Sequence, residues 1–326
     1  MGRDIARLHH VGHVVGDMPA ALECYRRLGF VLPPPSYPAM ARREGGEPEP
    51  FGAANTHADF ADGFLELATP VREGDRVPTD AHVVPLAAPP EVLPVLVEKI
   101  ATTSDNLAAC LDRFAGLHIL MFSSPDIDAA ATRLSASGVG HGGVNTVRRP
   151  VETEAGVVAE SVRYLEIDGA GARPGSVAEG RVGVVADLDR EIQGHRVAEH
   201  PNGAIALAEA VLCVADDDLT AVVARYERYL DRPVHPDGPA WIFDLDGARL
   251  TLVPASRLAD LLPGERVTAL PALVACSVAV RDLASTEEFL RGTAFSLSRT
   301  ADGAPFVPSS EAFGAAIIFR LAGRAT

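Results

Sequence analysis

One pattern occurs four times along the chain and constrains its fold more than any other feature. It consists of a short apolar strand, a turn that contains aspartate, a helix, and then further short β-like runs, and the four turns contain Asp17, Asp126, Asp218 and Asp282. Repetition of this kind indicates that one supersecondary unit has been copied. A βαβββ unit alone buries only one face of its sheet well. Two units side by side would curl into a larger half-open barrel and share an interior.

The chain length of 326 residues suits two domains rather than one. We therefore predict an α+β protein in which tandem βαβββ modules pair into two half-open barrels. The first domain is expected at 1–170, with modules at about 8–70 and 116–168. A linker rich in glycine and proline is expected at 171–203. The second domain is expected at 204–326, with modules at about 206–255 and 272–323.

A segment at 71–115 separates the first two modules and is interpreted as an insertion. Its proline-rich part, 78–94, is expected to form a loop. Ser104-Asp105-Asn106 then has the composition of a helix N-terminal cap, which predicts a short helix that ends near Ala115.

The charge and composition exclude several classes of partner. Lys and Arg number 29 against 44 Asp and Glu, so the net charge is −15, and the pI is about 5.1. Such an acidic chain is not expected to bind nucleic acid or an anionic membrane. It contains no apolar run of 18 residues and no signal-like start, and its four cysteines have no paired spacing. We expect a cytoplasmic protein with reduced thiols.

Histidine and glutamate occur at matching places in the first two modules. Each module has one histidine near its start and one glutamate near its end, within strand-like sequence: His10, Glu66, His118 and Glu166. Two neutral imidazoles and two carboxylates can hold a divalent transition metal and leave positions open for substrate. We predict one metal per chain, for which nickel, cobalt, zinc, iron or manganese would be suitable.

Strand periodicity predicts what surrounds this metal site. His10 is expected to share a face with Gly12 and Val14, and His13 to lie on the opposite face. The same alternation would surround the metal with aromatic residues, Phe64, Phe122 and Tyr164. For His57 the pattern leaves two interpretations open, a pocket residue or a surface residue.

Modules three and four lack the ligand pattern. Alignment of their aspartate turns places Val211 and Ala275 at the histidine positions, and Thr251 and about Arg320 at the glutamate positions. We therefore expect the second half to be a structural partner, or a wall of the substrate pocket, without a metal of its own.

The first two modules resemble the glyoxalase/bleomycin-resistance group, the vicinal oxygen chelate superfamily, which also includes extradiol dioxygenases. The motifs are His10, then Val15-Gly16-Asp17, then Tyr25-Arg26-Arg27-Leu28-Gly29-Phe30, and finally Phe64-Leu65-Glu66-Leu67. The resemblance covers all four modules and is sharp only in the first two. It implies the paired-module fold. It leaves the reaction open, because the superfamily includes isomerases, epimerases, dioxygenases, thiol transferases and binding proteins.

A metal held by two histidines and two glutamates would act as a Lewis acid and stabilise an enediolate, with Glu66 or Glu166 as the catalytic base. We therefore predict an isomerase or epimerase that acts on a small hydroxy-carbonyl substrate. The four-module form with one intact site is similar to the epimerases that act on sugar-like cyclitols.

Two alternatives remain open. One is an Fe(II) extradiol-type dioxygenase; the four-module dioxygenases carry two histidines and one glutamate in the C-terminal half. The other is a non-catalytic ligand-binding or resistance protein, a class whose members usually lack the metal set. The expected partner is a small molecule. A homodimer is also possible, so the modules could pair within or between chains.

Overall fold

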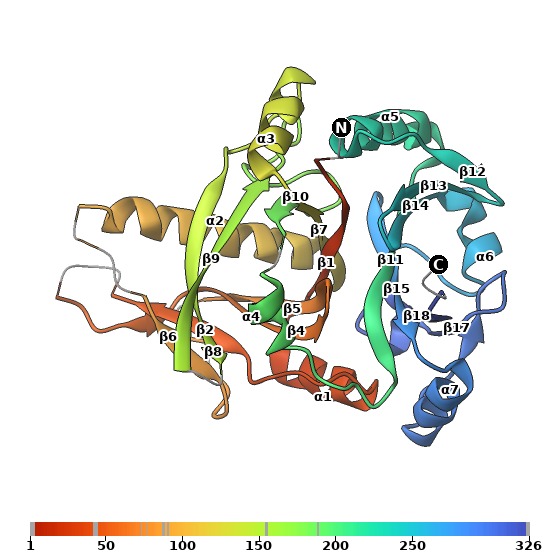
Figure 1. The fold of residues 1–326 in the computed structure, drawn as a ribbon, viewed down its shortest axis with the longest axis horizontal. Helices are drawn as coiled ribbons and strands as arrows, with labels where there is room; N and C mark the ends of the chain where they lie inside the picture. The colour runs from red at the N-terminus through yellow and green to blue at the C-terminus, as the bar shows by residue number, and fades with distance from the viewer. Residues whose placement is uncertain are drawn as a thin grey trace.

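The computed structural model describes residues 4–323 except 42–44, 73, 76, 87, 88, 90, 154, 155 and 188. Two curved sheets stand side by side in it, coloured red to green for the first half and green to blue for the second (Figure 1). None of the helices within the described ranges is long and apolar enough to span a membrane.

Module one forms a sheet in the order β1-β5-β4-β2. The Asp17 side chain caps its helix by accepting a hydrogen bond from the backbone N–H of Ala20, and Pro19 occupies the first turn. Gly29 follows the helix with a positive φ of 85°, a conformation that favours glycine. The elements are β1 (Arg7–Val14), α1 (Met18–Arg27), β2 (Ser36–Met40), β3 (Glu49–Pro50), β4 (Gly52–Phe60) and β5 (Gly63–Val71).

Module two repeats this arrangement in the order β7-β10-β9-β8. Asp126 caps its helix as Asp17 caps α1. The last strand, β10, lies within the stretch predicted to be a linker, and so does the short helix α4. The elements are β7 (Gly116–Ser124), α3 (Ile127–Ala136), β8 (Asn145–Thr153), β9 (Gly156–Glu166), β10 (Arg181–Ala186) and α4 (Arg190–Gly194).

The insertion is more regular than its proline content predicts. It contains β6 (His82–Pro85), which pairs with β2, and α2 (Leu93–Arg113), which packs on β4 and β5. The helix starts eleven residues before Ser104, with Pro94 in its first turn, and Ser104 is buried inside the helix. Proline is tolerated in the first turn because the N–H groups there have no intrahelical partner.

The second half contains two further copies, in the orders β11-β14-β13-β12 and β15-β18-β17-β16. The third module comprises β11 (Ala204–Val214), η1 (Asp216–Asp218), α5 (Leu219–Leu230), β12 (His235–Asp237), β13 (Ala240–Leu245) and β14 (Ala248–Pro254). After η2 (Ala255–Arg257) and α6 (Leu258–Leu261), the fourth comprises β15 (Ala272–Val280), α7 (Leu283–Gly292), β16 (Ser298–Arg299), β17 (Pro305–Val307), η3 (Ser309–Glu311) and β18 (Ala316–Leu321).

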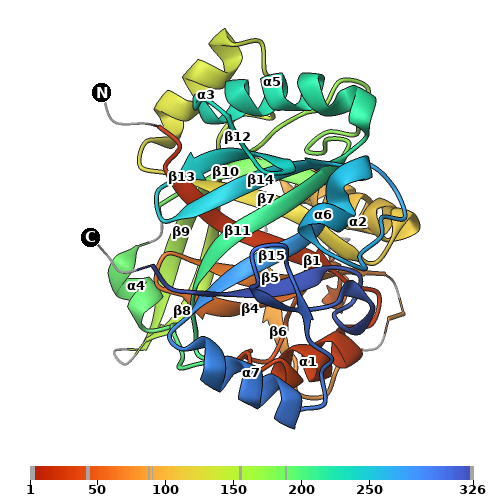
Figure 2. The same ribbon diagram turned by 90° about the vertical axis from the view of Figure 1, so that its right-hand side faces the viewer.

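The modules pair within the chain. β1 pairs with β7, and β11 with β15, both antiparallel, so each half is one curved sheet built from two modules. This confirms the predicted fold class. The halves meet through β7 and β15, where Leu117 pairs with Leu273, and through β1 and β11, with α1 beside α7 and α3 beside α5 (Figure 2). Between the halves, Arg232 donates hydrogen bonds to the carbonyl oxygens of Ile5 and Ala6.

Candidate functional site

The concave face of the first sheet carries the polar residues of the candidate site. Gly12 marks this face, because a Cβ added to it would lie 2.7 Å from the Ile119 Cβ and 2.9 Å from the Glu66 Oε2. Ile119, Met121 and Val14 form one apolar cluster on this side, and Tyr164 packs against it. A buried histidine–glutamate pair lies beside that cluster.

This pair is His10 and Glu66. The His10 Nε2 is 3.7 Å from the Glu66 Oε2, and the two side chains are 11% and 9% exposed. The Asn55 amide donates a hydrogen bond of 3.2 Å to the other carboxylate oxygen of Glu66. The β1 and β5 strands run parallel with Gly12 opposite Glu66, which brings the start of one strand to the end of the other. The structure thus brings together the two ligands predicted in module one.

Aromatic rings surround His10. Its imidazole stacks on Phe64, with centroids 4.4 Å apart and planes 11° apart. The His9 Nδ1 lies 2.6 Å from the His10 Nδ1, because a β-bulge between Leu8 and His10 turns both imidazoles to the same side. The half-buried His57 ring lies 4.5 Å from Phe64 and its Nδ1 is 3.0 Å from Arg196. His57 therefore belongs to the surroundings of the site.

Glu166 lies on the same concave face but is ion-paired. The Arg181 guanidinium on β10 donates from its Nε to the Glu166 Oε1. Burial lowers the pKa of Arg181, but the negative charges of Glu166 and Glu66 more than offset this effect and raise it. Arg181 therefore interacts electrostatically with both carboxylates that the sequence predicted as metal ligands.

A cleft of about 420 Å³ opens next to this ion pair. One wall is the inserted helix α2, which contributes Lys99, Asn106 and Cys110, and the other wall is formed by the loop 168–176. Tyr164, Glu166 and Arg181 line it from β9 and β10. Tyr164, predicted as a pocket residue, is thus one of the lining residues.

His118 and Phe122 lie on the other face of β7. The His118 Nε2 lies 2.8 Å from the Phe114 carbonyl oxygen, and its ring packs on Phe114 at 4.2 Å. Burial lowers the pKa of His118 to about 4, although hydrogen bonds to the backbone of Phe114 and Glu179 act in the opposite direction. Phe122 belongs to the main core behind the sheet. The structure does not bring His118 or Phe122 to the site that was predicted for them.

Strand register explains this difference. Asp17 caps α1 seven residues after His10, and Asp126 caps α3 seven residues after Ile119. Ile119, not His118, is therefore the counterpart of His10. The strand that corresponds to β5 is β10, and the residue that corresponds to Glu66 is Gly183. Glu166 lies one strand further along, opposite Gly183, where module one has His57.

Gly183 could not be replaced by a metal-ligating residue without a rearrangement of its neighbours. A Cβ there would meet the Leu165 carbonyl oxygen at 2.3 Å and the Met121 sulfur at 2.9 Å. Within the described parts of the chain, no three His, Cys, Asp or Glu side chains are grouped so as to hold a metal ion. As arranged, the four predicted ligands do not fit a divalent metal, because one faces away and another is held by arginine.

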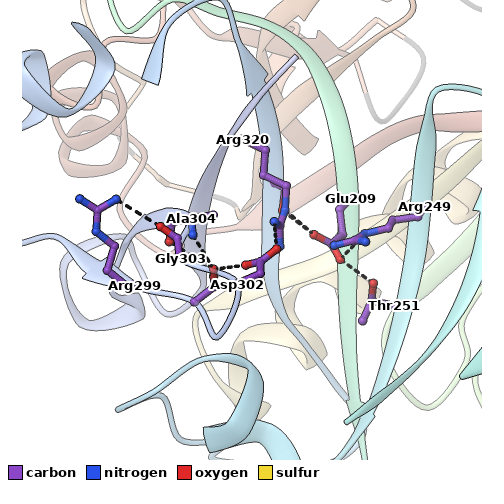
Figure 3. A network of polar contacts seen from close by, with 10 residues as sticks. Glu209, Arg249, Thr251, Arg299, Asp302, Gly303, Ala304 and Arg320 are labelled. Carbon is purple, nitrogen blue, oxygen red and sulfur yellow. Dashed lines mark hydrogen bonds and ion pairs between the residues drawn. The ribbon is translucent and has the colours of Figure 1, made fainter. Parts of the chain in front are cut away.

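The second half has an arginine–carboxylate network at the corresponding place (Figure 3). The strand register makes Glu209, rather than Val211, the counterpart of His10, and Thr251 the counterpart of Glu66. The Glu209 carboxylate accepts hydrogen bonds from four side chains: Arg249 at 2.8 Å, Thr251 at 2.5 Å, Ser277 at 2.7 Å and Arg320 at 3.3 Å. It is 1% exposed. Burial alone would raise its pKa, but the two arginines and two hydroxyls lower it.

Sequence reasoning missed Arg181. It was assigned to a linker because the glycine- and proline-rich residues around 169–175 dominate that stretch. The sequence signal for this strand is the run Arg181-Val182-Gly183-Val184-Val185, which is rich in β-branched valine and lies at the end of a module-length repeat. A strand at this place would have put an arginine on the concave face.

Comparisons with known proteins agree with this architecture. A family model described as a glyoxalase-like domain matches residues 8–230. None of the curated protein sequences gives a match. Solved structures of similar fold include a hypothetical protein from Staphylococcus aureus, with a TM-score of 0.55, 10% identity, and coverage of 97% of this chain and 100% of that one.

Two further structures are similar over nearly the whole chain. A mutant 4-hydroxymandelate synthase from Streptomyces coelicolor has a TM-score of 0.54 and 12% identity, with coverage of 99% of this chain and 95% of that one. A Mn(II)-bound glyoxalase from Novosphingobium aromaticivorans has a TM-score of 0.50 and 12% identity, with coverage of 98% and 82%. At such identities the similarity shows the fold alone.

Proposed function

Because the chain belongs to the glyoxalase-like family of the vicinal oxygen chelate superfamily, we propose that its first half binds a small polar molecule in the cleft between α2 and β9. The observation that carries this proposal is the cleft of about 420 Å³ with the Glu166–Arg181 ion pair on its wall. This volume is in the range of small-molecule sites. The proposal corresponds to the ligand-binding alternative left open by the sequence, since members of that class usually lack the metal set.

The charges that line the cleft favour a neutral or cationic ligand. Acidic Glu98, Glu166 and Asp168 face basic Lys99 and Arg181, which leaves one negative charge in excess. The whole chain carries −15, so its field repels anions as well. The Asn106 and Asn145 amides and the Tyr164 ring supply hydrogen bonds and an apolar surface. These groups suit a hydroxylated ring such as a sugar or cyclitol.

The roles of the residues follow from their positions. The ion pair between Arg181 and Glu166 fixes both side chains, so their remaining donors and acceptors are oriented before a ligand arrives. The inserted helix α2 covers one side of the ligand and limits access of water.

Calorimetric titration with three probes of similar size tests this proposal: a neutral cyclitol, an aminocyclitol and a sugar acid. We expect the first or second to bind and the sugar acid to bind at least roughly tenfold more weakly. Glu166→Gln should weaken binding of the aminocyclitol, whereas the exposed Glu227→Gln on α5 serves as the control and should not. Preferential binding of the sugar acid, or equal affinities in both variants, would contradict the proposal.

A second candidate is the metal-dependent isomerase or epimerase predicted from the sequence. The observation that favours it is the adjacency of His10 and Glu66 at 3.7 Å. It requires a divalent ion and a rearrangement that frees Glu166 from Arg181. Elemental analysis of protein purified without added metal, combined with deuterium incorporation from heavy water into a hydroxyketone, tests this candidate. Metal-free protein that incorporates no deuterium would exclude it.

A further inference from the structure

Arg181 occupies a defined place relative to the two glutamates. Glu66, Gly12, Ile119 and Arg181 stand in one row across β5, β1, β7 and β10, because each is the register partner of the next. Gly12 has no side chain, so Ile119 and the Glu66 Oε2 close in above it, where a Cβ would lie 2.7 Å and 2.9 Å from them. Glu166 reaches the same concave face from β9 and receives the Arg181 hydrogen bond there.

The guanidinium supplies the charge that a cation would supply. Two carboxylates facing one concave space repel each other unless a positive charge lies between them. Arg181 is 25% exposed at its side chain and Glu166 is 24% exposed, so both are largely removed from solvent. The lone pair of the Glu166 Oε1 that accepts the Arg181 N–H bond is not available to a metal, and the positive guanidinium beside this carboxylate repels a divalent cation. The guanidinium and a metal therefore compete at Glu166.

We propose that Arg181 and a divalent cation compete for Glu66 and Glu166, and that the guanidinium holds the Glu166 carboxylate in the conformation described. This competition does not depend on which molecule enters the cleft, so it is independent of the proposed function. It explains how the chain keeps this fold with His10 and Glu66 in place, although their counterparts in module two are Ile119 and Gly183.

The test compares Ni²⁺ binding by the wild-type protein and by Arg181→Met, using calorimetry and thermal denaturation. We expect the variant to bind Ni²⁺ at least roughly tenfold more tightly than the wild type, and Ni²⁺ to raise its melting temperature. In Arg181→Lys the positive charge remains, so the gain should be absent. Adding Glu166→Gln to Arg181→Met should abolish the gain, because the freed carboxylate is gone.

A matched control comes from the second half. Arg249→Met removes one arginine from Glu209, but Arg320, Thr251 and Ser277 remain bound to that carboxylate. This variant should therefore gain no Ni²⁺ binding.

Two results would overturn the proposal. One is wild-type protein that binds Ni²⁺ as tightly as Arg181→Met. The other is a folded Arg181→Met that gains no affinity. If Arg181→Met does not fold, Arg181→Gln replaces it under the same criteria. The wild-type titration remains decisive in any case, since tight binding abolished by His10→Ala would show that Arg181 excludes no metal.

Discussion

The same strand position carries His10 in the first half and Glu209 in the second, and their surroundings differ. His10 lies 3.7 Å from Glu66, on a face that continues into a cleft of about 420 Å³. Glu209 is held by two arginines and two hydroxyls at 1% exposure, beside an apolar cluster that includes Ile242 and Ile318. The difference teaches that one copied unit can place some of its polar groups, Glu166 and Arg181, on the wall of a cleft, while the other uses them to hold strands together.

The difference also has an energetic side. A buried carboxylate is tolerated when all of its acceptors are satisfied, and removal of one partner then leaves an uncompensated charge. The polar residues of the second half should thus contribute strongly to stability. Those of the first half should contribute less, because Glu166 and Arg181 are about one quarter exposed and line the cleft.

The largest expected effect comes from Glu209→Ala compared with Glu66→Ala. The first leaves the half-buried Arg249 and Arg320 without the Glu209 carboxylate, which should cost about 3–5 kcal/mol of unfolding free energy. The second should cost less, about 1–3 kcal/mol, since the carboxylate that it removes contacts the Asn55 amide and the His10 imidazole rather than two arginines. Urea denaturation measures both. Equal losses would show that the two halves use these positions alike.

The next largest effect is pH dependence, to which two buried histidines of the first half should contribute. Burial lowers the pKa of His13 and of His118 to about 4 from the ordinary 6.5. The unfolded chain therefore binds more protons, and stability falls as the pH drops from about 6.5 to about 4, by roughly 3 kcal/mol for each histidine. The contribution of these two histidines should level off below pH 4.

The counterparts of these histidines in the second half are Leu212 and Val274. The double variant His13→Leu, His118→Val copies that half and should remove most of this acid sensitivity. Urea denaturation at pH 7.5 and pH 4.5 gives the comparison. An undiminished loss of stability in the double variant would place its origin elsewhere.

Much of the fold was predictable because local signals agree with the tertiary structure. The aspartate caps at Asp17, Asp126 and Asp282, each followed by an apolar helix face, mark three of the four modules. The pairing of His10 with Glu66 follows from the same repeat, since β1 and β5 are its first and last strands.

The rest depends on register, which sequence periodicity does not determine. The pairing of β1 with β7 has two bulges, and the one between Gly12 and His13 leaves His118 out of the register, so His118 faces the core while Ile119, opposite Gly12, faces the site. The Arg181 strand follows a loop with the composition of a linker, so the sequence predicts Glu166, rather than a residue of β10, at the end of module two. Helix α2 begins within the proline-rich stretch, because tertiary packing on β4 and β5 stabilises it there.

A smaller effect tests whether β9 and β10 leave room for a side chain at Gly183, whose counterpart in the second half is the buried Ile318. Gly183→Ala would place a Cβ 2.3 Å from the Leu165 carbonyl oxygen, so the backbone must shift at a cost of roughly 2 kcal/mol. A control is Gly140→Ala in the same half, where a Cβ would find its nearest atom at 3.6 Å. Thermal denaturation separates them; similar melting temperatures would mean that β9 and β10 adjust freely and that a ligand could fit there.

The smallest effect compares single hydrogen bonds to the two carboxylates. Ser277→Ala removes the 2.7 Å bond to the Glu209 Oε2, at a site where Ser277 and Glu209 are 0% and 1% exposed, so water does not readily replace the hydroxyl. Bonds to buried charged groups contribute about 1.5–3 kcal/mol, so the loss should lie near the lower end because Arg320 still reaches that oxygen. Asn55→Ala removes a longer bond of 3.2 Å to Glu66, and Asn55 is half-buried, so water can take over and the loss should be about 0.5 kcal/mol. Urea denaturation midpoints at constant slope resolve this difference. A larger loss for Asn55→Ala would reverse the comparison, because it would mean that the first half, rather than the second, depends on its polar network for stability.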